Sequence, residues 1–173
     1  METLLDVVSL KMVKNEELRN KYDKINTPKA TYELIKDLII DSDKEMLIAI
    51  SLDNQSKPTN VSIISVGTST SAIANPREVY KFALLSNASR IILVHNHPSG
   101  SLEPSKDDIE TTKAMIKAGK ILNIIVNDHI IVSENGYYSM KKENRYIFDD
   151  KLIFAGATRW KSMIIVKWTV IAV

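Results

Sequence analysis

The sequence predicts an α/β domain in which a mixed sheet is flanked by helices. Short apolar runs rich in β-branched residues, each typical of a buried strand, alternate with longer segments whose apolar residues recur at helical spacing. Two of the strand-like segments are separated by a short polar turn, which indicates an antiparallel hairpin within the sheet. With 173 residues, of which 45% are hydrophobic, the chain is long enough to bury the core of one compact domain.

The first predicted elements are a helix and a two-stranded hairpin. Thr27 is expected to act as an N-cap and Pro28 to occupy the first helical position, after which apolar residues recur at helical spacing. This helix runs to about residue 40. Residues 46–52 and 60–66 then form the two strands of the hairpin, because both are apolar runs bounded by polar turn residues.

The middle of the chain alternates helix, strand and helix. A second helix begins at Asn75 and Pro76, and residues 90–94 form a short buried strand. Ser105 opens a third helix, which Gly119 is expected to close. The apolar faces of these two helices are expected to consist of Val79, Phe82 and Ala83 in the first and Ile109, Thr112, Met115 and Ile116 in the second.

The last predicted elements complete the sheet. Residues 124–126 and 130–132 are two short apolar strands. Asn135 and Gly136 form a tight turn that leads into a further strand at residues 137–140. The order of all these elements predicts a mixed sheet with helices packed against it.

Two histidines at the end of the third predicted strand form the most informative pattern of the chain. His95 and His97 are two residues apart, so their side chains project from the same face of an extended chain while Asn96 faces away. A Pro-Ser-Gly turn follows, and then Ser105 and Asp108 at the start of the next helix. The full spacing, HxH-x7-S-x2-D, allows the returning loop to bring the Asp108 carboxylate beside both imidazoles.

Ser105 and Asp108 also have a purely structural interpretation, which is compatible with a role for Asp108 beside the histidines. Ser105 and Asp108 form an S-x-x-D capping box, which would start the helix whatever the protein did. Histidines two apart on a strand are also common without a metal. The combination is much rarer by chance, and it predicts a metal site with His95, His97 and Asp108 as ligands.

Zinc is the metal that this ligand set favours. Structural zinc sites close all four positions, usually with thiolates, whereas catalytic zinc keeps one position for water. The chain has no cysteine, so a three-ligand site would be catalytic by default. Such a metal lowers the pKa of its water and polarises a carbonyl oxygen, which predicts carbonyl hydrolysis.

The block from His95 to Gly100, together with the following Pro-Ser-x-x-Asp, resembles the JAB/MPN metalloprotease motif in the form found in RadC-like proteins. The similarity covers roughly residues 25–142. It includes Gly67, Thr68, Asn75 to Val79, Ala83 and Ser86 to Ala88 upstream, and Asp128 to Val132, Tyr138 and Ser139 downstream. This resemblance implies a JAB/MPN α/β/α fold, similar to the cytidine deaminase-like arrangement.

The resemblance also implies catalytic roles. In JAB/MPN enzymes a glutamate near the strand after the first helix acts as general base, and Glu45 matches it best. The alternative is an ordinary solvated glutamate at a strand entrance. Ser105 would donate to the developing oxyanion. His129 is expected to be structural, with orientation of a metal ligand as the alternative, and Arg77 and Glu78 to serve electrostatics or packing.

The ends of the chain lie outside the expected JAB/MPN domain of residues 25–142. Residues 1–24 are predicted to be an extension whose partial alternation allows an added strand or hairpin. Residues 143–173 form an atypical apolar tail, and its run at 162–173 is too short to span a membrane, which takes about twenty residues. The tail could be an extra strand, a contact in a homo-oligomer or an aggregation-prone segment. The chain has no room for the helical segment of longer RadC-like proteins, which predicts a standalone domain.

Charge and composition narrow the functional classes. The net charge of +2 comes from well-mixed acidic and basic residues, so nucleic-acid binding is not indicated. The absence of a signal pattern and of cysteine agrees with a cytoplasmic protein. We expect a zinc-dependent metalloprotease or isopeptidase acting on an unidentified protein or peptide. The alternatives are a factor associated with DNA repair or recombination, and a non-catalytic MPN scaffold.

Overall fold

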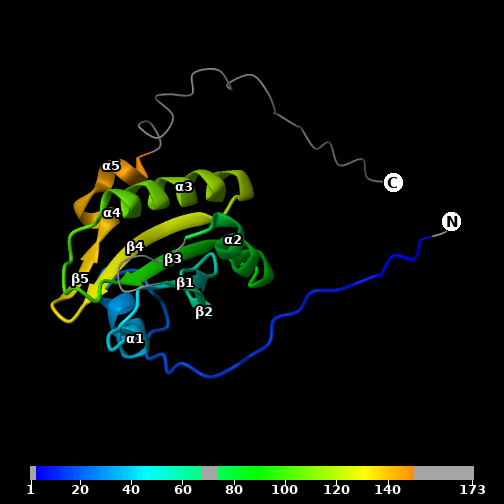
Figure 1. The fold of residues 1–173 in the computed structure, drawn as a ribbon, viewed down its shortest axis with the longest axis horizontal. Coiled ribbons are helices and arrows are strands. Elements are labelled where there is room, and N and C mark those ends of the chain that lie inside the picture. The colour runs from blue at the N-terminus through cyan, green and yellow to red at the C-terminus, as the bar shows by residue number, and fades with distance from the viewer. Residues whose placement is uncertain (1–2, 68–73, 150–173) are drawn as a thin grey trace, which may run out of the picture.

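A computed structural model describes residues 3–67 and 74–149, which form a five-stranded sheet in the order β2-β1-β3-β4-β5 with helices on both faces (Figure 1). The β3–β4 pair is parallel and the other three pairs are antiparallel, so the sheet is mixed as the sequence predicts. The elements are α1 Pro28–Ile39, β1 Met46–Leu52, β2 Pro58–Val66, α2 Pro76–Leu85, β3 Arg90–Asn96, α3 Lys106–Leu122, β4 Ile125–Ser133, β5 Gly136–Ser139, α4 Met140–Glu143 and α5 Arg145–Phe148.

The central strands carry a separate apolar core on each face of the sheet. In β3, Ile91 and Leu93 join a cluster with residues of α2 and α3, while Ile92 and Val94 pack with residues of α1 on the other face. Strand β1 lies between β2 and β3, and all seven of its residues are buried. Burial on both faces holds the sheet rigidly and fixes the direction in which each strand residue points.

The first half of the chain follows its sequence signals closely. Thr27 caps α1 by accepting a hydrogen bond from the backbone N–H of Ala30 at 3.2 Å, and Pro28 begins the helix. Strand β1 has the predicted bounds, whereas β2 starts at Pro58, two residues earlier than predicted. Asn75 caps α2 as expected.

Helix α3 does not end at Gly119, as the sequence suggested, but continues to Leu122. Asn123 ends it in the left-handed region, with φ of +57°. Gly119 has a packing role instead: a Cβ atom there would lie 2.3 Å from the carbonyl oxygen of Ile124 and 2.4 Å from Oη of Tyr80. Gly119 therefore allows α3 to pack closely against Tyr80 and the carbonyl of Ile124, and it does not end the helix.

The two strands predicted at 124–126 and 130–132 are one strand, β4. Val126 pairs with Ile91 and Asp128 pairs with Ile92, so Asn127 is an extra residue that makes a β-bulge. The strand continues through the polar pair Asn127 and Asp128, and the hydroxyl of Ser139 donates to the Asp128 carboxylate inside the structure. The bulge also reverses the alternation, which directs the side chain of His129 to the same face as Val126.

The turn before β5 differs slightly from its prediction. Glu134 and Asn135 form the turn, and Gly136, with φ of +121°, is already the first residue of β5. Met140 begins α4 instead of ending the strand.

The described segment that precedes α1 has no regular secondary structure. Residues 3–24 contain no helix or strand, so the added strand that their alternation allowed is not formed. The apolar tail lies outside the described residues from 150 onward, and its three interpretations stay predictions. No helix within the described residues is long and apolar enough to cross a membrane.

We expect Gly119→Ala to lower the free energy of unfolding by about 1–3 kcal/mol, because the added methyl group overpacks a buried contact with backbone atoms. Urea denaturation measures the change. Lys117→Ala, at an exposed position two residues earlier on the same helix, is the control and should leave stability nearly unchanged. Equal stability of the glycine and alanine proteins would show that α3 does not pack as described.

Candidate metal centre

The end of β3 places two histidines on the face that α3 covers. His95 is 5% exposed and pairs with Leu47 of β1, and His97 follows the last strand residue. Between them Asn96 faces away, as alternation predicts. Its Oδ1 accepts a hydrogen bond from the backbone N–H of Met46 at 2.7 Å, and its Nδ2 donates to the carbonyl of Lys44 at 3.0 Å. The histidine-bearing end of β3 is thereby tied to the entrance of β1, where Glu45 lies.

The loop after His97 turns back toward the start of α3. The His97 backbone N–H donates to the carbonyl of Val132 at 2.9 Å, and Gly100 adopts φ of +81°. The Asn135 side chain fixes the loop from the β4–β5 turn by donating to the carbonyl of Gly100 at 2.9 Å. This arrangement returns the chain to Ser105, the N-cap of α3.

The predicted capping box is present and orients Asp108. The Ser105 hydroxyl accepts from the backbone N–H of Asp108 at 3.1 Å, and Asp108 Oδ2 accepts from the backbone N–H of Ser105 at 2.7 Å. The Ser105 hydroxyl also donates to Asp108 Oδ2 at 2.6 Å. The carboxylate is therefore held by the first turn of its own helix.

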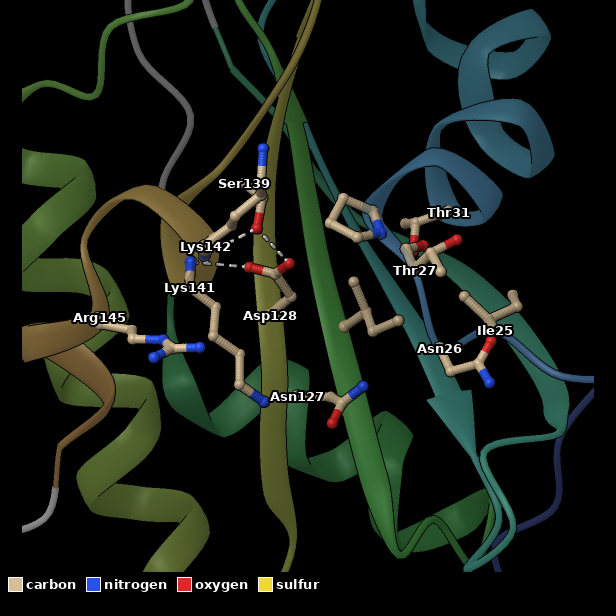
Figure 2. A pocket seen from close by; sticks show the side chains of 12 residues that line it. Ile25, Asn26, Thr27, Thr31, Asn127, Asp128, Ser139, Lys141, Lys142 and Arg145 are labelled. Atoms are coloured by element: carbon tan, nitrogen blue, oxygen red, sulfur yellow. Dashed lines mark hydrogen bonds between the residues drawn. The ribbon is translucent and has the colours of Figure 1, made fainter.

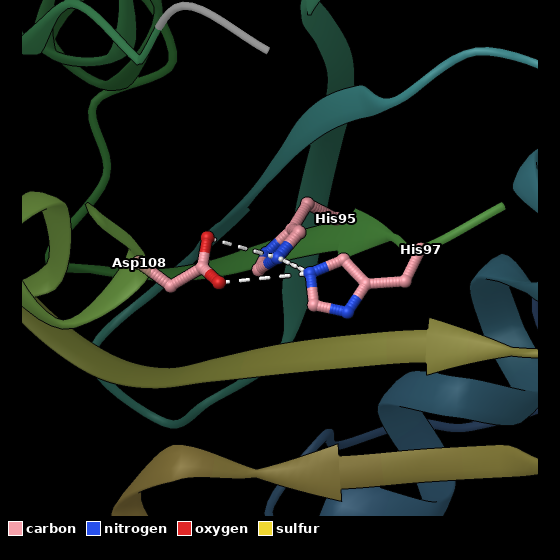
Figure 3. Close-up of side chains that lie close together, drawn as sticks. All are labelled: His95, His97 and Asp108. Atoms are coloured by element: carbon pink, nitrogen blue, oxygen red, sulfur yellow. Dashed lines mark hydrogen bonds and ion pairs between the residues drawn. The ribbon is translucent and has the colours of Figure 1, made fainter. Parts of the chain in front are cut away.

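The three predicted ligands converge (Figure 3). Asp108 Oδ1 lies 3.2 Å from His95 Nε2, Asp108 Oδ2 lies 3.6 Å from His97 Nε2, and the two Nε2 atoms are 3.0 Å apart. Within the described residues this is the one group of three histidine, cysteine or carboxylate side chains found that could hold a metal ion, with its ligand atoms within 4.8 Å of one another.

The remaining nitrogens of both imidazoles have partners elsewhere, which leaves the Nε2 atoms for the centre. His97 Nδ1 lies 3.0 Å from the carbonyl oxygen of Ser101, so it must be the protonated nitrogen. His95 Nδ1 lies 2.8 Å from Nε2 of His129. Two imidazole nitrogens and one carboxylate oxygen facing a common point fit a divalent metal that prefers nitrogen and oxygen ligands.

The electrostatics of the centre favour a cation. Burial alone would raise the pKa of the Asp108 carboxyl, but the adjacent His95 and His97 imidazoles and the hydrogen bond from the Ser105 hydroxyl outweigh it and hold that pKa well below its usual range. The hydrogen bond to Asp108 raises the pKa of His97, with burial opposing and Glu45 adding a smaller effect in the same direction. The raised pKa of His97 strengthens the competition between a proton and a metal ion for its Nε2 nitrogen.

A cavity of about 380 Å³ opens onto the cluster. Its lining includes Glu45 and Ser105 together with the three candidate ligands and Leu47. Glu45 is half-buried, and its backbone carbonyl accepts from the N–H of Gly67 at 2.8 Å. The structure therefore brings Glu45 to the same cavity as the candidate ligands, from a position fifty residues earlier than His95 in the sequence.

The sequence left the role of His129 open and gave Thr112 only a place on the apolar face of α3. His129 is 1% exposed, and its Nδ1 lies 2.6 Å from the Thr112 hydroxyl while its Nε2 contacts His95. Burial lowers the pKa of His129 well below its ordinary value, and the nearby His95 adds to the effect. A threonine on the buried face of a helix was the one local signal of this contact.

A second cavity of about 260 Å³ lies beside Asp128 and the start of α1 (Figure 2). Burial raises the pKa of Asp128, although hydrogen bonds from the Ser139 hydroxyl and the backbone N–H of Lys141 oppose it. These bonds place Asp128 at the junction of β4, β5 and α4 (Figure 2), where it joins the three elements.

Comparison with known proteins identifies the family. A model of the RadC-like JAB domain matches residues 25–146. The chain belongs to the RadC-like JAB domain family. The mixed sheet flanked by helices is consistent with a JAB/MPN domain.

Relatives of this RadC-like chain include UPF0758 proteins from several organisms. The one from Methanosarcina barkeri is 39% identical over 120 residues, which cover 69% of this chain and 52% of the relative. The one from Finegoldia magna is 46% identical over 118 residues, which cover 68% and 53%. The chain thus spans about half the length of the curated relatives it matches, and their names state no activity.

We expect zinc, used as a probe of the centre, to stabilise the protein more as the pH rises. The raised pKa of His97 means that its protonated form stabilises the metal-free fold below about pH 6.5, and this contribution is lost as the pH rises through the folded-state pKa. Zinc needs neutral imidazoles, so proton and metal compete.

Thermal unfolding with and without zinc at about pH 5.5 and about pH 7.5 measures the effect. The zinc-induced rise in Tm should be larger at the higher pH. Magnesium, which prefers oxygen ligands, is the control and should give little shift at either pH. A zinc shift of equal size at both pH values would contradict the competition.

Proposed function

We propose that this RadC-like JAB domain is a zinc-dependent hydrolase that cleaves a peptide, isopeptide or similar amide bond. The observation that carries the proposal is the convergence of His95, His97 and Asp108 at a cavity that Glu45 also lines. The substrate class follows from the family resemblance and from the carbonyl chemistry that such a ligand set supports. A cytoplasmic protein or peptide is the substrate we propose.

His95, His97 and Asp108 are the residues that would hold the metal. Zinc with three protein ligands supplies Lewis-acid activation of water and polarisation of a carbonyl oxygen. The chain contributes rigid ligands: His95 is on a strand buried on both faces, and Asp108 is held by the capping box of α3. Fixed ligands reduce the reorganisation that accompanies the reaction.

Glu45 is the residue we propose as general base. It lies at the entrance of β1, beside the strand that carries His95, and its charge is close enough to raise the pKa of His97. A carboxylate in this position would take a proton from the attacking water and deliver it to the leaving nitrogen.

Ser105 is proposed to donate to the oxyanion that develops on the substrate carbonyl. In the structure its hydroxyl proton is directed to Asp108 Oδ2 instead. A serine hydroxyl has one proton, so the two tasks exclude each other at any instant. The Asp108 carboxylate keeps a hydrogen bond from the Ser105 backbone N–H whichever way the hydroxyl turns.

We expect Glu45→Gln to lower amide-hydrolase activity by about 100-fold or more while leaving zinc binding intact, because the amide keeps the shape but cannot accept the proton. Activity against a library of peptides and isopeptides, together with zinc content, measures both effects. Glu103→Gln is the matched control, because Glu103 lines the same cavity.

The control protein should keep nearly full activity. Loss of zinc from Glu45→Gln would show that Glu45 is a ligand and not a base. Full activity of Glu45→Gln on a substrate that the wild type cleaves would contradict the proposed mechanism.

A further inference from the structure

A continuous chain of buried hydrogen bonds lies behind the metal-facing side of His95. Thr112 of α3, His129 of β4 and His95 of β3 are 0%, 1% and 5% exposed. The Thr112 hydroxyl lies 2.6 Å from the backbone carbonyl oxygen of Asp108 and 2.6 Å from Nδ1 of His129, and His129 Nε2 lies 2.8 Å from Nδ1 of His95. The other ring nitrogen of His95, Nε2, lies 3.2 Å from the carboxylate of the same Asp108.

The direction of each hydrogen bond follows from counting protons. A carbonyl oxygen has no proton, so the short contact between Thr112 and Asp108 requires the hydroxyl proton of Thr112. That hydroxyl has no second proton, and its equally short contact with His129 therefore requires a proton on Nδ1 of His129. Helical threonines commonly donate to the carbonyl four residues earlier, which agrees with this direction.

The same count fixes the tautomer of His95. In a neutral His129 ring, a proton on Nδ1 leaves Nε2 as an acceptor. His95 must then donate from Nδ1, which leaves the Nε2 of a neutral His95 without a proton. That nitrogen faces His97 Nε2 and Asp108 Oδ1. When His97 is also neutral, its Nε2, the Nε2 of His95 and Oδ1 of Asp108 direct three lone pairs at the position where a cation would lie.

We propose that Thr112 and His129 are positioning residues that hold His95 as the Nδ1-protonated tautomer, with its Nε2 lone pair directed at the metal position. Asp108, in the first turn of α3, then has two roles. Its carboxylate supplies a ligand, and its backbone carbonyl orients His95 through Thr112 and His129. The tautomer follows from the hydrogen bonds of a neutral His129, whereas its consequence for metal binding rests on the proposed function.

The β-bulge at Asn127 makes this arrangement attainable. Val126 pairs with Ile91 and Asp128 with Ile92, so the extra residue shifts the alternation of β4 and brings His129 opposite Leu93. His129 consequently shares the face of the sheet that carries His95. Without the extra residue the imidazole would face α1 and could not reach either Thr112 or His95.

Thr112→Val tests the proposal, because valine keeps the shape of threonine and removes the hydroxyl. Thr112→Ser is the matched control that keeps the hydroxyl. Long-range ¹H–¹⁵N NMR of the histidine rings in the metal-free proteins, at about pH 8 where neutral imidazoles prevail, reports which nitrogen is protonated. Zinc affinity is then measured by competition with a chelator, and thermal unfolding verifies that each variant is folded.

In the wild type and in Thr112→Ser we expect protons on Nδ1 of both His95 and His129. In Thr112→Val the His129 signal should shift toward the other tautomer, and zinc affinity should fall by about 10-fold to 100-fold, as is typical when a partner of a metal ligand is lost. An Nε2-protonated His95 in the wild type would overturn the proposal, even if the variants failed to fold. Unchanged tautomers and zinc affinity in a folded Thr112→Val protein would also overturn it.

The two measurements separate this inference from the proposed function. If the wild type shows the expected tautomers but binds no zinc, the metal-dependent hydrolase fails and the orientation of His95 stands. If the wild type binds zinc but His95 carries its proton on Nε2 in the metal-free protein, the positioning role fails and the metal centre stands.

Discussion

The contact on which the candidate site depends is the one between the first turn of α3 and the end of β3. Ser105 and Asp108 start the helix as a capping box, and the same Asp108 carboxylate faces both imidazoles. The Asp108 side chain thus accepts a hydrogen bond from the backbone N–H of the N-cap Ser105, at a helix terminus where a negative charge is favoured, and completes a ligand set. A local helix signal and a long-range functional contact therefore share the same carboxylate.

The rest of the fold holds these two elements in register. Strand β3 is buried between two apolar cores, which fixes the face of the sheet from which each of its side chains projects. Asn96 connects the end of β3 to the entrance of β1 beside Glu45 by a hydrogen bond. Behind the ligands, Thr112 and His129 connect α3 to β4 and β4 to β3. The three candidate ligands are therefore held by contacts from β4, from the loop after β3 and from the start of α3, as a preorganised site requires.

Much of this could be predicted from local patterns. Period-two alternation placed His95 and His97 on one face, the capping box located the start of α3, and β1 was predicted residue for residue. What sequence could not supply depends on contacts between distant elements. Gly119 was predicted to close its helix, because local spacing does not show that Tyr80 of α2 and the carbonyl of Ile124 pack against it. Similarly, the role of His129 depends on a bulge at Asn127 that no periodicity reveals.

The central claim is that this RadC-like JAB domain binds a metal through the three residues that converge in Figure 3. Elemental analysis of untagged protein, loaded with zinc near neutral pH and gently dialysed, tests it most directly. The account predicts about one zinc per chain in the wild type and loss of that zinc in His97→Ala. Wild-type protein without metal under these conditions would contradict the account and leave a non-catalytic JAB scaffold as the better description.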